Sequence, residues 1–208
     1  TFSNGMLNVA IGASSFRSNI TSNDNTGLGT HSGYYATSGS NTFIGSYSGY
    51  GVSAALTTGN ANTAVGNRSL GLFTTGYQNT AMGDYALYNN AAGFQNTALG
   101  AGALDYNTTG NRNTGVGFWT GRNGVTPFTG SDNFYAGYNA GNFNYTGSNN
   151  TLIGSNTNVN TSTLTYATAL GSGATVNCSS CLALGGTTGA SRTRVGIGTN
   201  APTFFLDV

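Results

Sequence analysis

A five-residue phrase of polar and apolar positions recurs along the chain. It has the form Asn-Thr-x-φ-Gly, where φ is apolar, and strict copies lie at 25–29, 41–45, 62–66, 79–83, 96–100, 113–117 and 150–154. Looser copies lie at 8–12, 133–137, 167–171, 181–185 and 195–198. The closing glycines are most often 17 residues apart, with two longer intervals and a shortened end. A fixed period of this length indicates a repeat architecture.

Each module also carries a second apolar position, three or four residues after the glycine, as at Leu70, Leu87 and Leu104. A polar turn that ends in glycine follows, so a module reads as a short strand, a turn, a second short strand and another turn. Seventeen residues are too few for a βαβ crossover, and none of them has helical periodicity. We therefore predict an all-β fold, a parallel β-solenoid (β-roll) of about 17-residue coils stacked about 4.8 Å apart.

Side chains alternate along a strand, so Thr63 and Val65 share one face while Asn62 and Ala64 share the other. We expect the apolar fourth position to stack as a ladder in the core: Leu28, Ile44, Val65, Met82, Leu99, Val116 and Ile153. The glycine permits a sharp corner, and the asparagine can cap a turn and stack on its copies. The phrase is apolar or small on both faces, and one narrow coil encloses little volume. We therefore predict that three copies pack together as a homotrimer.

Composition removes several other classes of protein. Charged residues are 5% of the chain and the formal net charge is +1. The chain also contains 34 Gly. The 12 Tyr and 11 Phe argue against disorder. The basic residues are scattered, which argues against nucleic acid, and no apolar run reaches the roughly 20 residues of a membrane helix. The chain opens in mid-pattern at Thr1, as a fragment of a longer protein would.

The copies NVAIG, NTAVG and ATALG, with the ending YATALGSGATVNCSSCLALGG, resemble the heads of trimeric autotransporter adhesins of the YadA type. In that family a similar phrase recurs about every fourteen residues in a trimeric β-roll, and the 17-residue copies depart from it. The end of the chain, RVGIGTNAPTFFLDV, is similar to a junction found in phage tail fibres and related bacterial fibres. That resemblance divides the chain into a repeat region, 1–192, and a junction, 193–208, that leads toward a coiled coil or a C-terminal chaperone. Both imply an extracellular fibre on a bacterial surface.

Recognition, if present, is expected where the repeat is interrupted, at 48–61 and 118–132. Insertions in solenoids commonly carry binding, and aromatic faces stack on sugars. The candidate ligand-binding residues are Trp119, Phe118, Arg122, Phe128, Tyr47 and Tyr50. The competing interpretation is that Phe118 and Trp119 only cover the edge of a coil.

The sequence contains few residues that could form a catalytic or metal-binding site. His31 has no Cys or Asp beside it, and Asp84 and Asp105 occupy different positions relative to their glycines. We therefore expect no enzyme activity, no cofactor and no metal, although three copies of His31 could meet on a trimer axis. Cys178 and Cys181 lie in a turn without a helix, which favours a local disulfide over a redox motif, with free or interchain thiols as the alternative.

The sequence thus favours a trimeric bacterial surface fibre or adhesin that binds glycans or envelope receptors through loops, without inserting into the membrane. A purely structural shaft, with recognition elsewhere, is the alternative. An ice-binding solenoid is a weaker third, because Thr would share its strand face with core residues.

Overall fold

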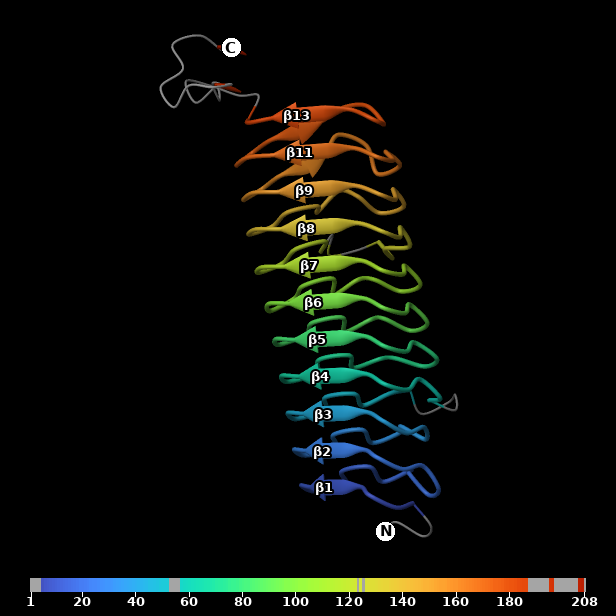
Figure 1. Cartoon of the computed structure of the whole chain (residues 1–208). Helices are drawn as coiled ribbons and strands as arrows, with labels where there is room; N and C mark the ends of the chain where they lie inside the picture. Colours follow the sequence, from blue (N-terminus) through green and yellow to red (C-terminus); the bar gives the residue numbers. More distant parts are fainter. Residues whose placement is uncertain are drawn as a thin grey trace.

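The computed structural model describes residues 5–52, 57–122, 124, 126–186, 195–196 and 206–207. Within these residues the chain is an all-β solenoid without a helix, and its coils are roughly 17 residues long, as predicted. Figure 1 shows the coils stacked in one column, with one labelled strand in each coil and all of these strands pointing the same way. The described part of the junction is a short parallel pair, β14 (Val195–Gly196) and β15 (Leu206–Asp207). The remainder of 193–208 lies outside the described residues.

The main sheet of the described chain has eleven strands, and each pairs in parallel with the strand of the next coil. Equivalent residues are in register, so Thr63 pairs with Thr80 and Val65 with Met82. The strands are β1 (Val9–Ile11), β2 (Thr26–Leu28), β3 (Thr42–Ile44), β4 (Thr63–Val65), β5 (Thr80–Met82), β6 (Thr97–Leu99), β7 (Thr114–Val116), β8 (Phe134–Ala136), β9 (Thr151–Ile153), β11 (Thr168–Leu170) and β13 (Leu182–Leu184).

The predicted core ladder faces the wrong way. The middle residue of each strand points inward, as Ala64, Ala81 and Ala98 do, whereas the fourth position of the phrase points outward. Met82 is 46% exposed and Leu28 45%. In eight of the eleven strands this inward position is Ala or Gly, and these small residues carry too weak an apolar signal to mark the inner face.

The predicted second strand is also absent from most of the described coils. In its place the chain forms a turn in which every second residue is left-handed, as at Arg68 (φ 54) and Leu70 (φ 50). The turn still bonds from coil to coil, because the Leu70 N–H donates to the Ala86 carbonyl at 2.9 Å. A paired second strand forms near the end of the solenoid, between β10 (Asn158–Val159) and β12 (Thr175–Val176).

The left-handed turn supplies the bulk of the core. Leu70, Leu87 and Leu104, the second apolar position of their modules, are completely buried. Because their backbone is left-handed, these leucines take a conformation that usually favours glycine. Burial of a leucine side chain is worth about 1.5–3 kcal/mol, which offsets the roughly 1–2 kcal/mol cost of that conformation.

Large and small residues exchange places between the strand and the turn. Tyr135 fills the middle of β8, and the turn positions on either side of it are Gly121 and Gly141. A Cβ at Gly141 would lie 2.6 Å from the Tyr135 ring, and one at Gly121 would lie 2.5 Å from Leu104. The core therefore keeps its volume from coil to coil although its residues change.

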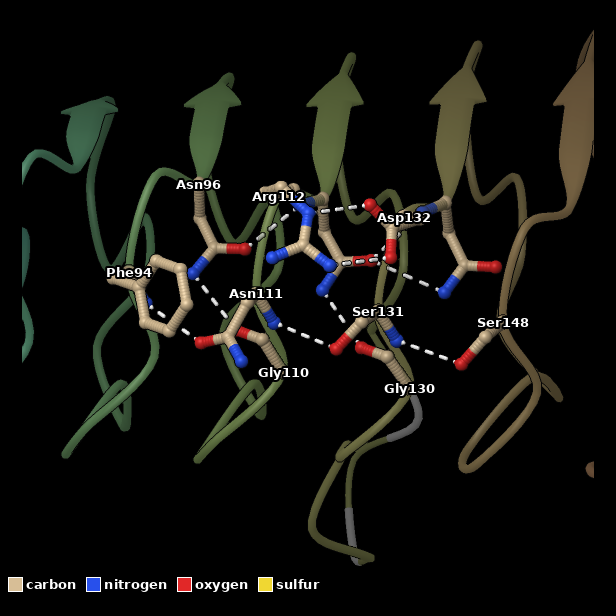
Figure 2. A network of polar contacts seen from close by, with 11 residues as sticks. Phe94, Asn96, Gly110, Asn111, Arg112, Gly130, Ser131, Asp132 and Ser148 are labelled. Atoms are coloured by element: carbon tan, nitrogen blue, oxygen red, sulfur yellow. Dashed lines mark hydrogen bonds and ion pairs between the residues drawn. The ribbon is translucent and has the colours of Figure 1, made fainter.

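The asparagine of each phrase is buried and bonds to its copies, as the sequence predicts. Asn113 donates its backbone N–H to Oδ1 of Asn96 at 2.9 Å and its side-chain amide to the Gly130 carbonyl at 2.8 Å. Figure 2 shows this ladder beside the exposed ion pair of Arg112 with Asp132. The asparagine side chains thus satisfy buried backbone N–H and carbonyl groups of neighbouring coils.

A disulfide joins Cys178 to Cys181, and their Cα atoms are 5.6 Å apart. It closes the turn that leads into β13, and the Cys181 carbonyl accepts a hydrogen bond from the N–H of Thr168 at 2.8 Å.

Candidate ligand-binding groove

Aromatic and arginine side chains gather on the turn that follows the glycine of each phrase. They occupy the second and fifth positions after that glycine, and the 17-residue period places them side by side in successive coils. The second-position residues are His31, Tyr47, Arg68, Tyr85 and Trp119. The fifth-position residues are Arg17, Tyr34, Tyr50, Tyr88 and Arg122.

Seven of these side chains, all except Arg17, His31 and Tyr34, line two hollows that share Tyr88, and we call the pair the groove. The first hollow has a volume of about 230 Å³ and is lined by Tyr47, Tyr50, Arg68, Gly71, Leu72 and Tyr88. The second has a volume of about 530 Å³ and is lined by Asp84, Tyr85, Tyr88, Asn89, Ala101, Gly102, Asp105, Tyr106, Phe118, Trp119 and Arg122. The groove therefore runs along the rod, across consecutive coils.

Two glycines make room for the rings of the groove. A Cβ at Gly71 would lie 2.5 Å from the ring of Tyr88, and a Cβ at Gly102 would lie 2.5 Å from the ring of Trp119. The indole and the phenol therefore lie directly over the backbone of the preceding coil. Flat aromatic surfaces of this kind suit the apolar faces of sugar rings.

An ion pair forms the inner wall of the second hollow. The Arg122 Nε donates to Oδ2 of Asp105 at 3.2 Å, and the guanidinium lies 4.7 Å from the ring centre of Trp119. Burial raises the pKa of the Asp105 carboxyl, and the hydrogen bonds from Arg122 and Asn89 offset part of that effect. Arg122 is thus held in place beneath the indole by charge and by stacking.

The structure brings together five of the six candidate ligand-binding residues, in two groups. Phe118, Trp119 and Arg122 line the second hollow, and Tyr47 and Tyr50 line the first. Phe128 does not belong with them: it is 1% exposed and packs against Tyr135 in the core. The prediction of a surface role for Phe128 is therefore wrong, because the chain of the second insertion turns back into the solenoid at this residue.

The insertions do not contain the whole groove. Residues 53–56 of the first and residues 123 and 125 of the second lie outside the described residues. The described parts stay bonded to neighbouring coils, as in the 3.0 Å bond from the Gly51 N–H to the Gly71 carbonyl. Tyr85, Tyr88 and Asp105 come from regular 17-residue modules, and reasoning from insertions missed them. Their positions relative to the glycine were the available signal.

His31 is half-buried among tyrosines. Its ring centre lies 4.9 Å from that of Tyr47 and 5.1 Å from that of Tyr34. Across the described ranges no group of three metal-ligating side chains gathers. Nor do these ranges contain a helix long and apolar enough to span a membrane.

A second surface is formed by the strands themselves, and we call it the outward strand face. It consists of the first and third residues of each strand of the main sheet, such as Thr80 and Met82 in β5. One row is mostly threonine and the other is aliphatic from Ile11 to Leu184. None of these residues is charged, and the face spans ten strand intervals, a length of about 50 Å.

Comparison of the chain with family models, with curated proteins and with solved structures gives no match. The class of protein is therefore defined by the fold and the two surfaces: a parallel β-solenoid repeat protein.

Proposed function

We propose that this chain is a segment of a homotrimeric fibre on a bacterial surface or a tail-fibre-like appendage, outside the cell, and that it binds glycans of a cell envelope through the groove. The observation that carries the proposal is the outward strand face. Soluble monomers rarely expose a contiguous apolar patch larger than a few hundred Å². An aliphatic row along the whole solenoid is stable in water when other copies of the chain cover it.

The geometry of the outward strand face suits a second copy better than an irregular partner. Both rows repeat at the spacing of the coils, so one solenoid can align with another along its whole length. The absence of charge from the described strands of the main sheet removes like-charge repulsion between copies. Three chains in this arrangement cover one another and leave the turns outside, where the groove can meet a ligand.

The oligomeric state tests the proposal. Multi-angle light scattering is expected to give a mass of three chains for the intact protein. Met82→Arg places a charge in the aliphatic row and is expected to release monomers, whereas Gln95→Arg, on an exposed turn, leaves the mass unchanged. A monomeric intact protein overturns the fibre proposal.

Glycan binding has its own test. The intact protein is applied to immobilised envelope polysaccharides, with Trp119→Ala as the variant and Tyr166→Ala, on another exposed turn, as the control. Loss of binding in the Trp119 variant alone supports the adhesin. If the intact trimer binds no polysaccharide, the segment is a structural shaft.

Ice binding is the second candidate, and one observation favours it. The sequence argument against it placed the aliphatic position in the core, but threonine and aliphatic rows lie together on the outward strand face. A regular, uncharged face of this kind can order water. The outward strand face cannot both bind ice and be covered by other copies. A monomer that shows thermal hysteresis, lost in Thr97→Lys, favours ice binding. A trimer favours the fibre.

A further inference from the structure

The two hollows of the groove differ in charge. The second contains the Arg122–Asp105 pair and a further carboxylate, Asp84. The first contains one charged side chain, Arg68, and no acidic residue lines it. A neutral unit therefore suits the second hollow, and an anionic unit suits the first.

Arg68 is held in place without being neutralised. Its Nη1 donates to the hydroxyl of Tyr85, and its guanidinium carbon lies 5.5 Å from the ring centre of Tyr85 and 5.8 Å from that of Tyr47. In the described part of the chain the ion pairs are Arg112 with Asp132 and Arg122 with Asp105. Arg68 therefore has no carboxylate partner there, and its Nε and Nη2 donate to no described residue.

The nearby acidic residue of the next coil does not change this. Asp84 adjoins Tyr85, but its Oδ1 accepts a hydrogen bond from the side-chain amide of Asn67 at 2.9 Å. A fixed guanidinium with free N–H groups, set between tyrosine rings, matches the planar carboxylate of a ligand, because a guanidinium can donate to both carboxylate oxygens at once.

Resting on the glycan binding proposed above, we infer that the first hollow binds the carboxylate of an acidic sugar of the uronic acid type. Tyr50 and Tyr88 supply the aromatic surfaces for its ring, and Leu72 adds an apolar contact. Because Tyr88 lines both hollows, the neighbouring neutral sugar of the same chain lies against Trp119. The ligand is thus an extended polysaccharide in which acidic and neutral units adjoin.

Isothermal titration calorimetry on the full chain tests the inference with two probes. One is a short oligogalacturonate and the other is the same oligosaccharide after its carboxylates have been reduced to alcohols. The intact protein is expected to bind the acidic probe at least about tenfold more tightly, the size of one charge-assisted hydrogen bond. Arg68→Gln is expected to remove this preference, and Arg68→Lys to retain part of it.

Arg17→Gln is the matched control, because Arg17 also donates to a tyrosine hydroxyl and lies 5.4 Å from a ring centre, but on Tyr34 and outside both hollows. It should leave the preference unchanged. Arg68 is exposed, so the melting temperature of its variants should match that of the intact protein.

The outcomes separate the two proposals. Equal binding of both probes, or a preference that survives Arg68→Gln, overturns the acidic-sugar inference and leaves glycan binding in place. Tighter binding of a sulfated oligosaccharide than of the oligogalacturonate overturns the choice of a carboxylate. If neither oligosaccharide binds, the acidic-sugar inference is overturned, and glycan binding itself is decided by the immobilised envelope polysaccharides.

Discussion

The hydroxyl of Tyr135 accepts a hydrogen bond from the side-chain amide of Asn144 at 2.6 Å, inside the core of the solenoid. Tyr135 is completely buried, and burial raises the pKa of its phenol far above the ordinary range. The phenol therefore stays neutral, and one amide satisfies a polar atom that the apolar interior could not otherwise accommodate.

Removal of this hydroxyl should destabilise the protein. Tyr135→Phe leaves the ring in place but deprives the Asn144 amide of its shortest bond, and we expect the free energy of unfolding to fall by about 1–2 kcal/mol. Chemical denaturation measures the change. Tyr138→Phe, at an exposed position, is the control and should have no effect. Equal stability of the Tyr135 variant and the intact protein would show that the bond contributes nothing.

The glycine that closes each phrase should not tolerate a side chain. Gly83 has φ 137, and a Cβ there would lie 2.5 Å from the carbonyl of Gly100 in the next coil. We expect Gly83→Ala to lower stability by several kcal/mol, on the order of 3, because backbone strain and a clash with backbone add together.

Gly173→Ala separates these two causes. Gly173 has φ 68, but its Cβ would lie 4.0 Å from the nearest atom, so only the backbone term applies. We expect a loss of about 1 kcal/mol. If the melting temperature of the Gly83 variant is no lower than that of the Gly173 variant, the added Cβ does not clash with the Gly100 carbonyl.

The buried asparagine ladder should be worth more than an exposed asparagine. In the intact protein Asn79 donates to the Gly93 carbonyl at 2.9 Å and accepts the Asn96 N–H at 2.9 Å. Asn79→Ala leaves the Asn96 N–H buried without its partner, and the Gly93 carbonyl keeps only the bond from the Asn90 amide. We therefore expect a loss of about 1–3 kcal/mol. Asn67→Ala removes a single exposed bond to Asp84 and should change stability little. Denaturant midpoints decide the comparison.

Stability should also depend on pH through Asp105. Its pKa is raised in the folded state, so its ionised form is less favourable there than in the unfolded chain. The folded state therefore loses stability as pH rises from the ordinary aspartate pKa of 3.8 toward the raised value. Asp105→Asn should remove this decline, which melting temperatures across acidic pH will measure. An unchanged profile in the variant assigns the decline to another group.

Arg112 and Asp132 act in the opposite direction. The Arg112 hydrogen bond lowers the pKa of Asp132, so this pair stabilises the folded state above pH 3.8 and is lost as pH falls. Both side chains are exposed, so water and salt screen the pair and its contribution is small.

The period of the phrase was sufficient to predict the solenoid, the strand within the phrase and the asparagine ladder, but not the absence of a second strand from most coils. It could not assign the faces, because Ala64 and Ala81 look weaker than Val65 and Met82 on any hydrophobic scale. The inner face was determined by the space that Leu70 and Leu87 fill from the turn, and a left-handed turn leaves no simple signal in leucine. The aliphatic row is on the outside of the single chain, so the sequence pattern of one coil does not show what covers it.

The groove was predictable only in part. Trp119 and Arg122 were predicted as ligand-binding residues because they lie in an insertion of unusual composition. Tyr88 and Asp105 lie in ordinary modules, and they join the site because stacking brings residues 17 apart into contact. Phe128 was misplaced because composition alone does not reveal where a long connection returns to the core.

The in-register pairing of equivalent residues also makes the coil a unit of length. Asn62, Asn79 and Asn96 form the same bonds with the coils on either side. If residues 79–95 were deleted, Asn96 would follow Gln78 and meet the surroundings that Asn79 has now. The rod can therefore grow or shrink by whole modules through duplication or loss of a short gene segment. The strand pairing and the asparagine bonds are kept, and the length of the rod changes by one coil.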